Sequence, residues 1–580
     1  MKRLFSFITL LILSSSLSVS TILAQLQSAP KFAAKAQKSI LSINTYDKKG
    51  DLMKSGTAFY IGANGEAIAD YALFKNAYKA MVIDASGKQY EVESILGADD
   101  TYSLVRFHVN TKGNSYLSSA NYIQGLGTEV FALNYSKDKI TSCPQGVIEN
   151  LDSINGKYAY YKFSVDMGDK YVGSPVFNVN GEVIGMLHSA LGKGTNMRSY
   201  AIDIRFRNEL KIAAIQSRSA TLALSNINIA KGIPDSQEEC LVYAYFKSRT
   251  ASNDEYMDIL NRFVAAYPQC AEAYYRRSTP LTDLQRFDEA NSDLEKYMSL
   301  AQDKAVANYN IAQAIYNKVQ FMPEPAYEKW TADIALEKIN KSIELETAQN
   351  RSESPSNLIK CNELKAQILA FKKDYDGAIN IYEELNVGEH KSPSYYYAMR
   401  LAREARGDSV SLIIADLDSA IAMFGTPVPA DAATFILRRG QVYAASKDYR
   451  KAVLDYNQYA YLLNSKVSDV FYYDRSQIEM EAHMYQQAID DISSAISIAP
   501  NKTLYYIEKA GMTIRFNMLD DCISACTTAI QLNPELADAY RIRGYAYIQK
   551  GNMTSARTDL QKAIDLGDTN ASEIMKTYVK

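Results

Sequence analysis

The chain has 580 residues, more than one hydrophobic core usually supports, so its length predicts at least two domains. Hydrophobic residues make up 47% and charged residues 22%, a globular balance that excludes global disorder. The net charge of −3 argues against a nucleic-acid binder, because such a protein needs a basic field.

The first 24 residues have the pattern of an export signal peptide. Lys2 and Arg3 form a charged start, residues 4–13 are apolar, and small and polar residues lead to Ala24, where we expect cleavage. The apolar run is too short for a comfortable transmembrane helix, and no cysteine near Ala24 indicates a lipid anchor. We therefore expect a bacterial protein in the periplasm, at the cell surface or outside the cell, without a transmembrane span after cleavage.

Residues 31–212 alternate short strand patterns with turns. Strand-like runs occupy residues 39–46, 80–84 and 182–187. Asn-Gly and Ser-Gly pairs, which favour tight turns, lie between such runs at residues 64–65, 86–87, 155–156 and 180–181. Many short strands with regular turns predict a closed β-barrel or a β-sandwich.

Three motifs in this segment resemble the trypsin-like serine peptidases of the bacterial housekeeping-protease type. Residues 55–61 resemble the strand that precedes the catalytic histidine, and residues 97–107 resemble the strand that carries the catalytic aspartate. Residues 173–185 resemble the segment that follows the nucleophile. The resemblance covers most of residues 31–212 and implies two packed β-barrels with the active site between them.

The catalytic positions implied by this resemblance hold other residues. Ala72 stands at the histidine position, Ser103 at the aspartate position and Val172 at the nucleophile position. Lys170 replaces a glycine that helps to shape the oxyanion hole. A serine hydroxyl needs an adjacent imidazole and an orienting group, and these residue types supply neither. We therefore predict a degenerate peptidase domain with no catalytic residues.

Two alternatives to a simple loss of activity stay open. A rearranged site that uses Ser174 would make the chain an active trypsin-like endopeptidase, although neither His108 nor His188 lies where a base facing Ser174 is expected. The inactive cleft would instead bind an extended peptide through backbone hydrogen bonds. Its candidate residues are Lys170, Tyr171, Val172, Gly173 and Ser174. No phosphate loop or paired-histidine motif occurs, so we expect no cofactor and no metal.

Helical patterns replace the strands after residues 213–235, which we predict to be a linker. Tyr472, Tyr506 and Tyr540 are spaced 34 residues apart, as are Pro500 and Pro534. A helix–turn–helix period of 34 residues is typical of tetratricopeptide repeats. Residues 236–570 accommodate about nine repeats, and residues 571–580 are predicted to form a capping helix. The predicted fold is therefore multidomain, an all-β double barrel followed by an all-α solenoid whose concave face binds protein or peptide partners.

Small residues recur in pairs twelve positions apart, which predicts that the two helices of each repeat approach closely there. The pairs are Ser278/Ala290, Ala366/Ala378, Gly440/Ala452, Ser476/Ala488, Ala510/Cys522 and Gly544/Ala556.

A basic residue precedes the first small residue of each pair, and four of the arginines have an aspartate sixteen residues later. These pairs are Arg277/Asp293, Arg439/Asp455, Arg475/Asp491 and Arg543/Asp559. Lys365 and Lys509 have no such acid. One interpretation is a basic ladder that grips an acidic peptide. We favour ion pairs within each repeat, because an arginine that keeps its aspartate in step suits the rigid guanidinium fork.

Six cysteines do not make a dense disulfide scaffold. Cys240 and Cys270 bracket one predicted helical hairpin, so a disulfide between them and two free thiols both stay open. The sequence favours an exported, non-enzymatic adaptor that recognises protein or peptide partners in the cell envelope.

Overall fold

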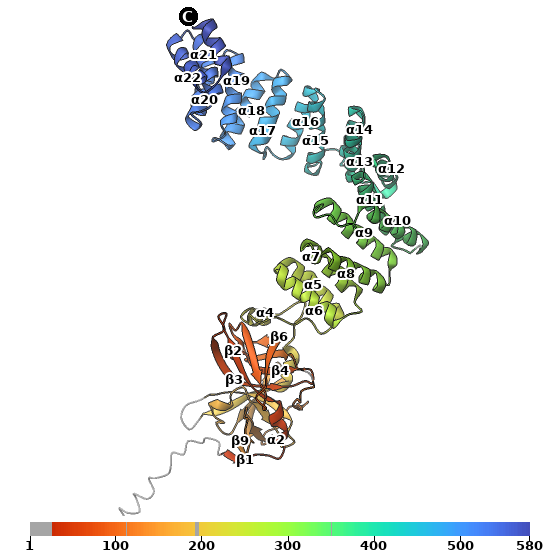
Figure 1. The fold of residues 1–580 in the computed structure, drawn as a ribbon, viewed down its shortest axis with the longest axis vertical. Coiled ribbons are helices and arrows are strands. Elements are labelled where there is room, and N and C mark those ends of the chain that lie inside the picture. The colour runs from red at the N-terminus through yellow and green to blue at the C-terminus, as the bar shows by residue number, and fades with distance from the viewer. Residues whose placement is uncertain (1–25, 112, 192–196, 350, 580) are drawn as a thin grey trace, which may run out of the picture. The chain divides into compact units, whose positions relative to one another are not determined.

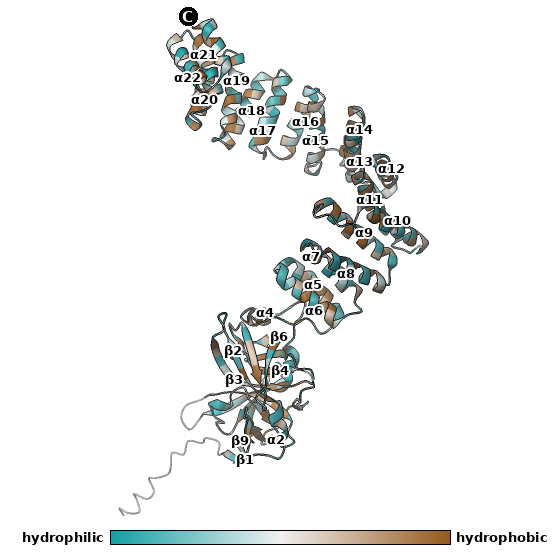
Figure 2. Cartoon of the chain, viewed as in Figure 1, coloured by the Kyte–Doolittle hydropathy of each residue, from teal (hydrophilic) through white to brown (hydrophobic). Residues whose placement is uncertain are grey.

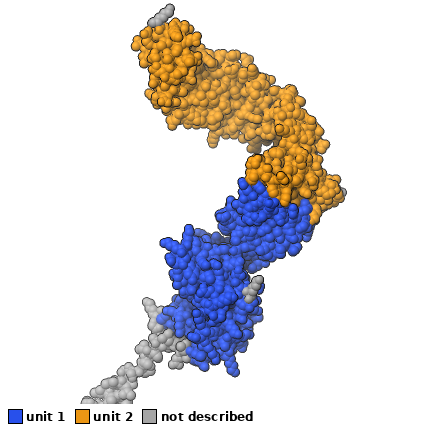
Figure 3. All heavy atoms as spheres, viewed as in Figure 1, with its two compact units in different colours: residues 1–302 blue, residues 303–580 orange. Residues whose placement is uncertain are grey.

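A computed structural model describes residues 26–111, 113–191, 197–349 and 351–579. The predicted signal peptide lies outside the described residues. Two compact units divide the chain, residues 1–302 and residues 303–580, and Figure 3 shows them in different colours. Figure 1 labels the helices and strands of each unit.

Six antiparallel strands close the first barrel in the order β2-β3-β4-β7-β6-β5. The strands are β2 (Ile40–Tyr46), β3 (Leu52–Tyr60), β4 (Glu66–Asp70), β5 (Lys79–Ile83), β6 (Gln89–Asp99) and β7 (Leu104–Val109). Side chains alternate between the two faces of a strand, so Leu41, Ile43 and Val105 point into a shared core and are fully buried.

The second barrel follows the order β9-β10-β13-β12-β11-β8 and closes through pairing of β8 with β9, while β1 adds to the edge of β9. Its strands are β1 (Leu26–Ser28), β8 (Glu129–Ala132), β9 (Ser142–Ile154), β10 (Tyr158–Phe163), β11 (Pro175–Phe177), β12 (Val183–Leu191) and β13 (Arg198–Asp203). The short helical segments of the two barrels are α2 (Ala33–Ala36), η1 (Gln37–Ser39), α3 (Tyr71–Phe74), η2 (Asp169–Tyr171) and η4 (Ile204–Glu209). The predicted double-barrel fold is confirmed.

All four predicted tight turns join antiparallel strands. Gly65, Gly87, Gly156 and Gly181 have φ angles between 67° and 86°, a backbone region that glycine adopts without steric cost. The turns connect β3 to β4, β5 to β6, β9 to β10 and β11 to β12.

The segment predicted as a linker folds onto the first barrel instead of spanning a gap. Residues 218–225 form α4 (Arg218–Ser225), and Ile227 and Ile229 are buried in the core of the first barrel. The backbone N–H of Ile95 in β6 donates to the carbonyl of Ala230 at 2.8 Å. Tyr243 and Ile259 of the first helical hairpin join the same core. Apolar side chains of this segment therefore complete a core that the strands leave open, and the first compact unit extends beyond the barrels to residue 302.

Eighteen consecutive helices of the described chain pair into nine antiparallel hairpins, followed by one further helix. The hairpins are α5 (Gln237–Thr250) with α6 (Asn253–Ala266), α7 (Ala271–Asp283) with α8 (Phe287–Leu300), α9 (Lys304–Phe321) with α10 (Ala332–Gln349), α11 (Ser354–Phe371) with α12 (Tyr375–Leu385), α13 (Pro393–Arg406) with α14 (Val410–Ala422), α15 (Ala433–Ala445) with α16 (Tyr449–Leu462), α17 (Asp469–Glu481) with α18 (Tyr485–Ile498), α19 (Thr503–Arg515) with α20 (Leu519–Leu532), and α21 (Ala537–Gln549) with α22 (Met553–Asp565). The last helix, α23 (Thr569–Tyr578), buries Ala571 against α22.

The predicted close approaches between paired helices are present. A Cβ atom added to Gly440 would lie 3.0 Å from the Cβ of Asp455 and 3.0 Å from the ring of Tyr456. A Cβ atom on Gly544 would lie 3.0 Å from the side chain of Leu560. Figure 2 shows polar and apolar residues interspersed along the helices, and no helix of the described residues is long and apolar enough to cross a membrane.

Candidate functional site

The barrel junction, defined here by Asp70, Ser103, the loop of residues 170–174 and His188, brings the predicted catalytic positions together. Asp70 ends β4 and caps the N-terminus of α3, because its Oδ1 accepts the backbone N–H of Ala72 at 2.7 Å. Ala72, at the histidine position, lies exposed on α3 and carries no polar side-chain atom. A polar group close to this predicted position is therefore the Asp70 carboxylate, which accepts the N–H of Ala72 itself.

Ser103, at the aspartate position, is held against the same turn. Its Oγ donates to Asp70 Oδ1 at 2.6 Å, and its carbonyl accepts the N–H of Tyr71 at 3.1 Å. Its φ angle of 48° lies in the left-handed region, which non-glycine residues rarely occupy. The hydroxyl serves as a donor to a carboxylate, which is the reverse of the role that an aspartate plays beside an imidazole.

The loop of residues 170–174 reaches the junction through Gly173. A Cβ atom on Gly173 would lie 3.2 Å from the carbonyl oxygen of Thr57 and 3.9 Å from the Cβ of Asp70, so only glycine fits closely here. Val172, at the nucleophile position, is half-buried, and Lys170 is exposed with its Nζ 5.1 Å from the ring centroid of Tyr171.

The backbone donors of this loop are already used. The N–H groups of residues 171–174 donate to the carbonyls of Gly168, Asp169, Leu187 and Tyr171, respectively, at 2.8 to 3.1 Å. In trypsin-like peptidases the N–H at the nucleophile position helps to stabilise the oxyanion, but the N–H of Val172 bonds inside the η2 turn. The loop therefore offers a peptide its exposed side chains and no free backbone donor among residues 171–174.

Ser174 lies deeper than a reactive serine needs to be. Its side chain is fully buried, and its Oγ has no hydrogen-bond partner among the described residues. A nucleophile must meet both its substrate and a base, and neither can reach Ser174 in this arrangement.

His188 of β12 is a member of the junction that sequence reasoning did not place there. Its Nδ1 lies 3.0 Å from the hydroxyl of Tyr160, and its buried Nε2 has no hydrogen-bond partner among the described residues. Burial lowers the pKa of His188, and the nearby Asp70 carboxylate and the backbone of Tyr102 oppose this shift only in part. His188 faces Asp70 from the other barrel, so only the packing of the barrels could reveal it. His108 instead bonds Glu93 on an exposed strand face.

The junction is therefore a polar cluster in which no described serine is hydrogen-bonded to an imidazole. Asp70 accepts hydrogen bonds, Ser103 donates one, and His188 is bonded to a tyrosine. No group of three or more His, Cys, Asp or Glu residues in the described part of the chain could hold a metal ion.

The two cysteines considered for a disulfide are free in the structure. Cys240 and Cys270 are both buried, and the Cys240 thiol donates to the carbonyl of Pro234 at 3.2 Å. Burial raises the pKa of both thiols, to about 12 for Cys240, which keeps them protonated. The Cys240 thiol is therefore hydrogen-bonded to Pro234, in the segment that precedes α5, and is not bonded to Cys270.

In the helical array, the arginine–aspartate pairs are bidentate ion pairs, as the sequence predicts. In Arg543, for example, Nε and one terminal nitrogen donate to the two carboxylate oxygens of Asp559 at 2.7 and 2.9 Å. The same geometry holds for Arg277 with Asp293, Arg439 with Asp455 and Arg475 with Asp491. The ladder interpretation is wrong for these residues, because their charges are neutralised inside the repeat.

The remaining nitrogen of each arginine reaches back to the preceding repeat. Its partners are Asn261 for Arg277, Asp418 for Arg439, Asn457 for Arg475 and Thr527 for Arg543, at 2.6 to 3.1 Å. Each arginine therefore fastens three consecutive helices, the second helix of one repeat and both helices of the next. The sequence indicated the acid partner through its constant spacing, whereas these third partners differ in type and spacing.

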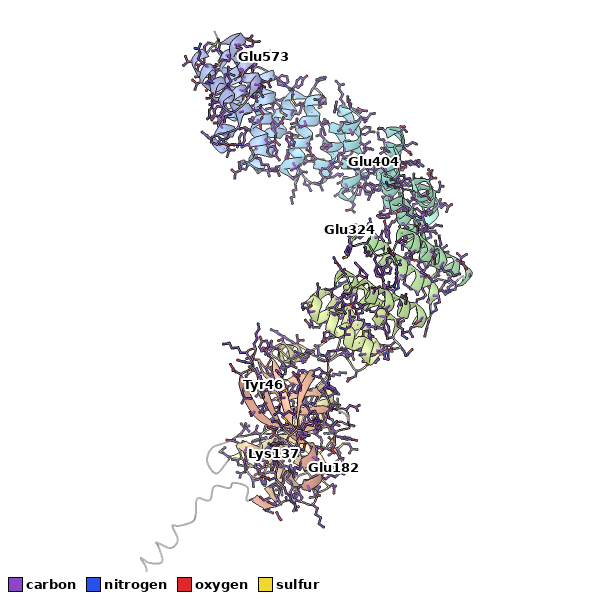
Figure 4. The ribbon with its side chains drawn as sticks, viewed as in Figure 1. Tyr46, Lys137, Glu182, Glu324, Glu404 and Glu573 are labelled. Carbon is purple, nitrogen blue, oxygen red and sulfur yellow. The ribbon has the colours of Figure 1, made fainter. Side chains whose placement is uncertain are left out.

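The fifth repeat, α13 with α14, keeps the pattern at a shorter spacing. Arg403 donates to Asp416, thirteen residues later, and to Glu383 of the preceding helix, both at 2.9 Å. In the same helix the fully buried Arg400 forms an ion pair with Glu404, which Figure 4 labels, at 2.6 Å.

Comparison with known proteins identifies the array. A tetratricopeptide-repeat family profile matches residues 520–571, which include α21 and α22. DnaJ protein P58IPK homolog B of Oryza sativa is 24% identical over 325 residues, or 53% of this chain and 59% of that protein. TPR repeat-containing protein MJ1428 of Methanocaldococcus jannaschii is 28% identical over 129 residues, or 22% of each chain. Anti-sigma-I factor RsgI9 of Acetivibrio thermocellus is 22% identical over 158 residues, 27% of this chain and 22% of that protein.

The chain spans between about a fifth and three fifths of these relatives' lengths. Among solved structures, the active form of the Rv3671c protease from M. tuberculosis aligns with 33% of this chain and 89% of its own, at 17% identity and a TM-score of 0.28. The described residues thus form two six-stranded barrels followed by an array of helical hairpins, part of which matches the tetratricopeptide-repeat family.

Proposed function

We propose that this protein is an exported, non-enzymatic adaptor of the bacterial cell envelope, in which a degenerate peptidase domain carries an array of tetratricopeptide repeats that binds protein or peptide partners. The observation that carries the proposal is the meeting of Ala72, Ser103 and the Val172 loop around Asp70. This arrangement supports the proposal, because alanine, serine and valine at the proposed catalytic positions would supply neither a base nor an activated nucleophile.

The array supports the binding half of the proposal. Stacked repeats bury their hydrophobic faces against one another and leave an extended surface, which is the usual protein-binding surface of such solenoids. Relatives of the array include one named Hsc70-interacting protein 1, from Drosophila melanogaster. The four arginines that recur in the array form ion pairs with aspartates of their own repeats, so the array would recognise its partners through other residues.

Labelling of the purified mature protein with a fluorophosphonate probe tests the enzymatic alternative. We expect no labelling and no cleavage of unstructured casein, because Ser174 is fully buried and has no bonded base. Ser174→Ala and Ser103→Ala are the matched controls. Labelling that disappears in either variant would mean that the chain is an endopeptidase with a rearranged site, its repeats recruiting substrate.

The peptide-cleft version of the proposal has its own test. Lys170 and Val172 are the residues of the loop that reach solvent, so Lys170→Glu and Val172→Asp would weaken the binding of a partner that occupies the cleft. Partner binding that is unchanged in both variants, measured by calorimetry, would leave the array as the binding surface and the barrels as its folded support.

A further inference from the structure

A cavity of roughly 450 Å³ lies within the first compact unit, where the segment that follows the barrels meets the first helical hairpin. Its apolar walls include Ile212 and Leu224 from that segment and Tyr243 and Phe246 from α5. This volume is in the range of sites that bind small ligands or a few residues of a chain. The cavity is separate from the barrel junction, because none of its lining residues belongs to that cluster.

Lys231 places an ammonium group in the wall of this cavity. Its Nζ donates to the carbonyls of Ile227 and Ile229 at 2.6 and 2.7 Å, which leaves one of the three ammonium donors. Burial lowers the pKa of Lys231 to about 8, so the charged form lacks full compensation. The remaining charges of the cavity, Lys247 and Glu255, are paired with each other at 2.9 Å. The cavity therefore has one unneutralised positive charge when Lys231 is protonated.

The surroundings of the cavity combine apolar and hydrogen-bonding surface. Ile215 and Leu222, close to it in sequence and on the same segment, have 80% and 55% of their surfaces exposed, and Phe246 has 44% exposed. Thr221 and Thr250 add hydroxyl groups to the lining, and because these donate to the carbonyls of Ser217 and Phe246, their oxygens remain as acceptors. A ligand with an anionic end, an apolar side group and amide groups would satisfy the ammonium, the walls and the hydroxyls together. A plain alkyl chain has no N–H group to donate to these hydroxyl oxygens, whereas a peptide backbone does.

We propose that this cavity binds the free C-terminus of a peptide or protein whose last residue is apolar. The terminal carboxylate meets Lys231, and the last side chain fills the space between Leu224, Tyr243 and Phe246. This inference deepens the proposed adaptor function and rests on it, because it assigns one class of partner to one place in the molecule. It needs no contribution from the barrel junction.

Fluorescence anisotropy on the full mature chain tests this assignment. The probes are two pools of fluorescein-labelled pentapeptides that end in leucine or phenylalanine, one with a free carboxylate and one with a C-terminal amide. We expect the carboxylate pool to bind at least tenfold more tightly, and its affinity to fall as the pH rises through about 8, where Lys231 loses its proton. The other titratable groups that face Lys231 are Glu255, Lys247 and Tyr243.

Two variants and one control locate the binding. Lys231→Met should weaken binding of the carboxylate pool at least tenfold, and Thr221→Trp should do the same by filling the cavity while Lys231 remains. Lys211→Met removes an exposed positive charge one residue before the cavity wall and should leave binding unchanged. Folding of each variant is checked by circular dichroism.

Equal binding of both pools, no binding of either, or binding that survives both variants would overturn the assignment. Binding of octanoate, measured by calorimetry, without any peptide binding would overturn it as well, because the ligand would then be a fatty carboxylate. These outcomes differ from failure of the adaptor function, which would be seen as fluorophosphonate labelling and casein cleavage at the barrel junction.

Discussion

The barrel junction and the helical array use polar groups in opposite ways. In the array, each arginine of the four regular pairs has its nitrogens occupied by partners that lie on adjacent helices. At the junction, Ser174 Oγ and His188 Nε2 are buried without partners in the described residues, and the groups near Asp70 lie up to 118 positions away in the chain. A satisfied polar group stabilises its surroundings and gives little indication of a ligand. An unsatisfied buried group lowers stability and marks a place where the fold has kept polar chemistry.

Removing one arginine that bonds three consecutive helices, here called an arginine clamp, is the strongest test of the view that these arginines stabilise the array. Arg475→Met should destabilise the protein by about 2–3 kcal/mol, because it leaves Asp491 buried without its partner. This loss of stability is at or below the smallest value typical of a broken buried ion pair, since 14% of the Arg475 side chain remains exposed. Lys509→Met is the matched control at the same helix position without an acid, and it should change stability by less than about 0.5 kcal/mol. Urea denaturation followed by circular dichroism measures both. Equal effects would mean that the clamp has no special role.

The close approach of paired helices should respond almost as strongly. Gly440→Val should cost about 2 kcal/mol, because its side chain would overlap Asp455 and Tyr456. The matched control is Gly511→Val in α19, where an added Cβ meets no atom within 4 Å. There the better helix propensity of valine should stabilise the helix by up to about 0.5 kcal/mol. Destabilisation at Gly511 as large as that at Gly440 would contradict the packing argument.

The buried imidazole of His188 should make the barrels sensitive to acid. Because the folded pKa of His188 is lowered below its usual value of 6.5, the unfolded chain binds the proton more readily, and stability falls as the pH drops through about 6.5. Hydrogen exchange of peptides from residues 158–203, compared at each pH between the wild type and His188→Gln, measures this loss. An identical pH profile in the two proteins would exclude His188 as its source.

A smaller effect is expected at Arg475, where a second acid of the same helix lies beside the arginine–aspartate pair. Glu479 lies 3.8 Å from Arg475, and burial together with the neighbouring Asp491 carboxylate raises its pKa above the usual 4.5. The folded chain therefore binds this proton more tightly than the unfolded chain, so Glu479 lowers stability at neutral pH and this penalty disappears as the pH falls. Glu479→Gln should raise the melting temperature at pH 8 and have little effect at pH 5. A shift of equal size at both values would argue against titration of Glu479.

Much of the array could be predicted from the sequence because its contacts recur at fixed short spacings. The 34-residue period, the small residues at Gly440 and Gly544 and the aspartate sixteen residues after Arg543 all reflect packing between neighbouring helices. The strand turns were equally predictable, since Gly65 and Gly156 must adopt positive φ angles whatever surrounds them. The degenerate catalytic positions stay a prediction, made from the motifs around Ala72, Ser103 and Val172.

Only the tertiary structure decided which distant residues meet. The segment predicted as a linker has no periodic pattern, yet Ala230 bonds to Ile95 of a strand 135 positions earlier, and the cavity at Lys231 exists because α5 packs over that segment. In the same way, His188 faces Asp70 because two separately closed barrels pack against each other. The sequence by itself determined the elements and the repeat, since these depend on neighbours along the chain. The junction and the cavity depend on contacts between segments whose separation follows no period, and such contacts leave no local signal to read.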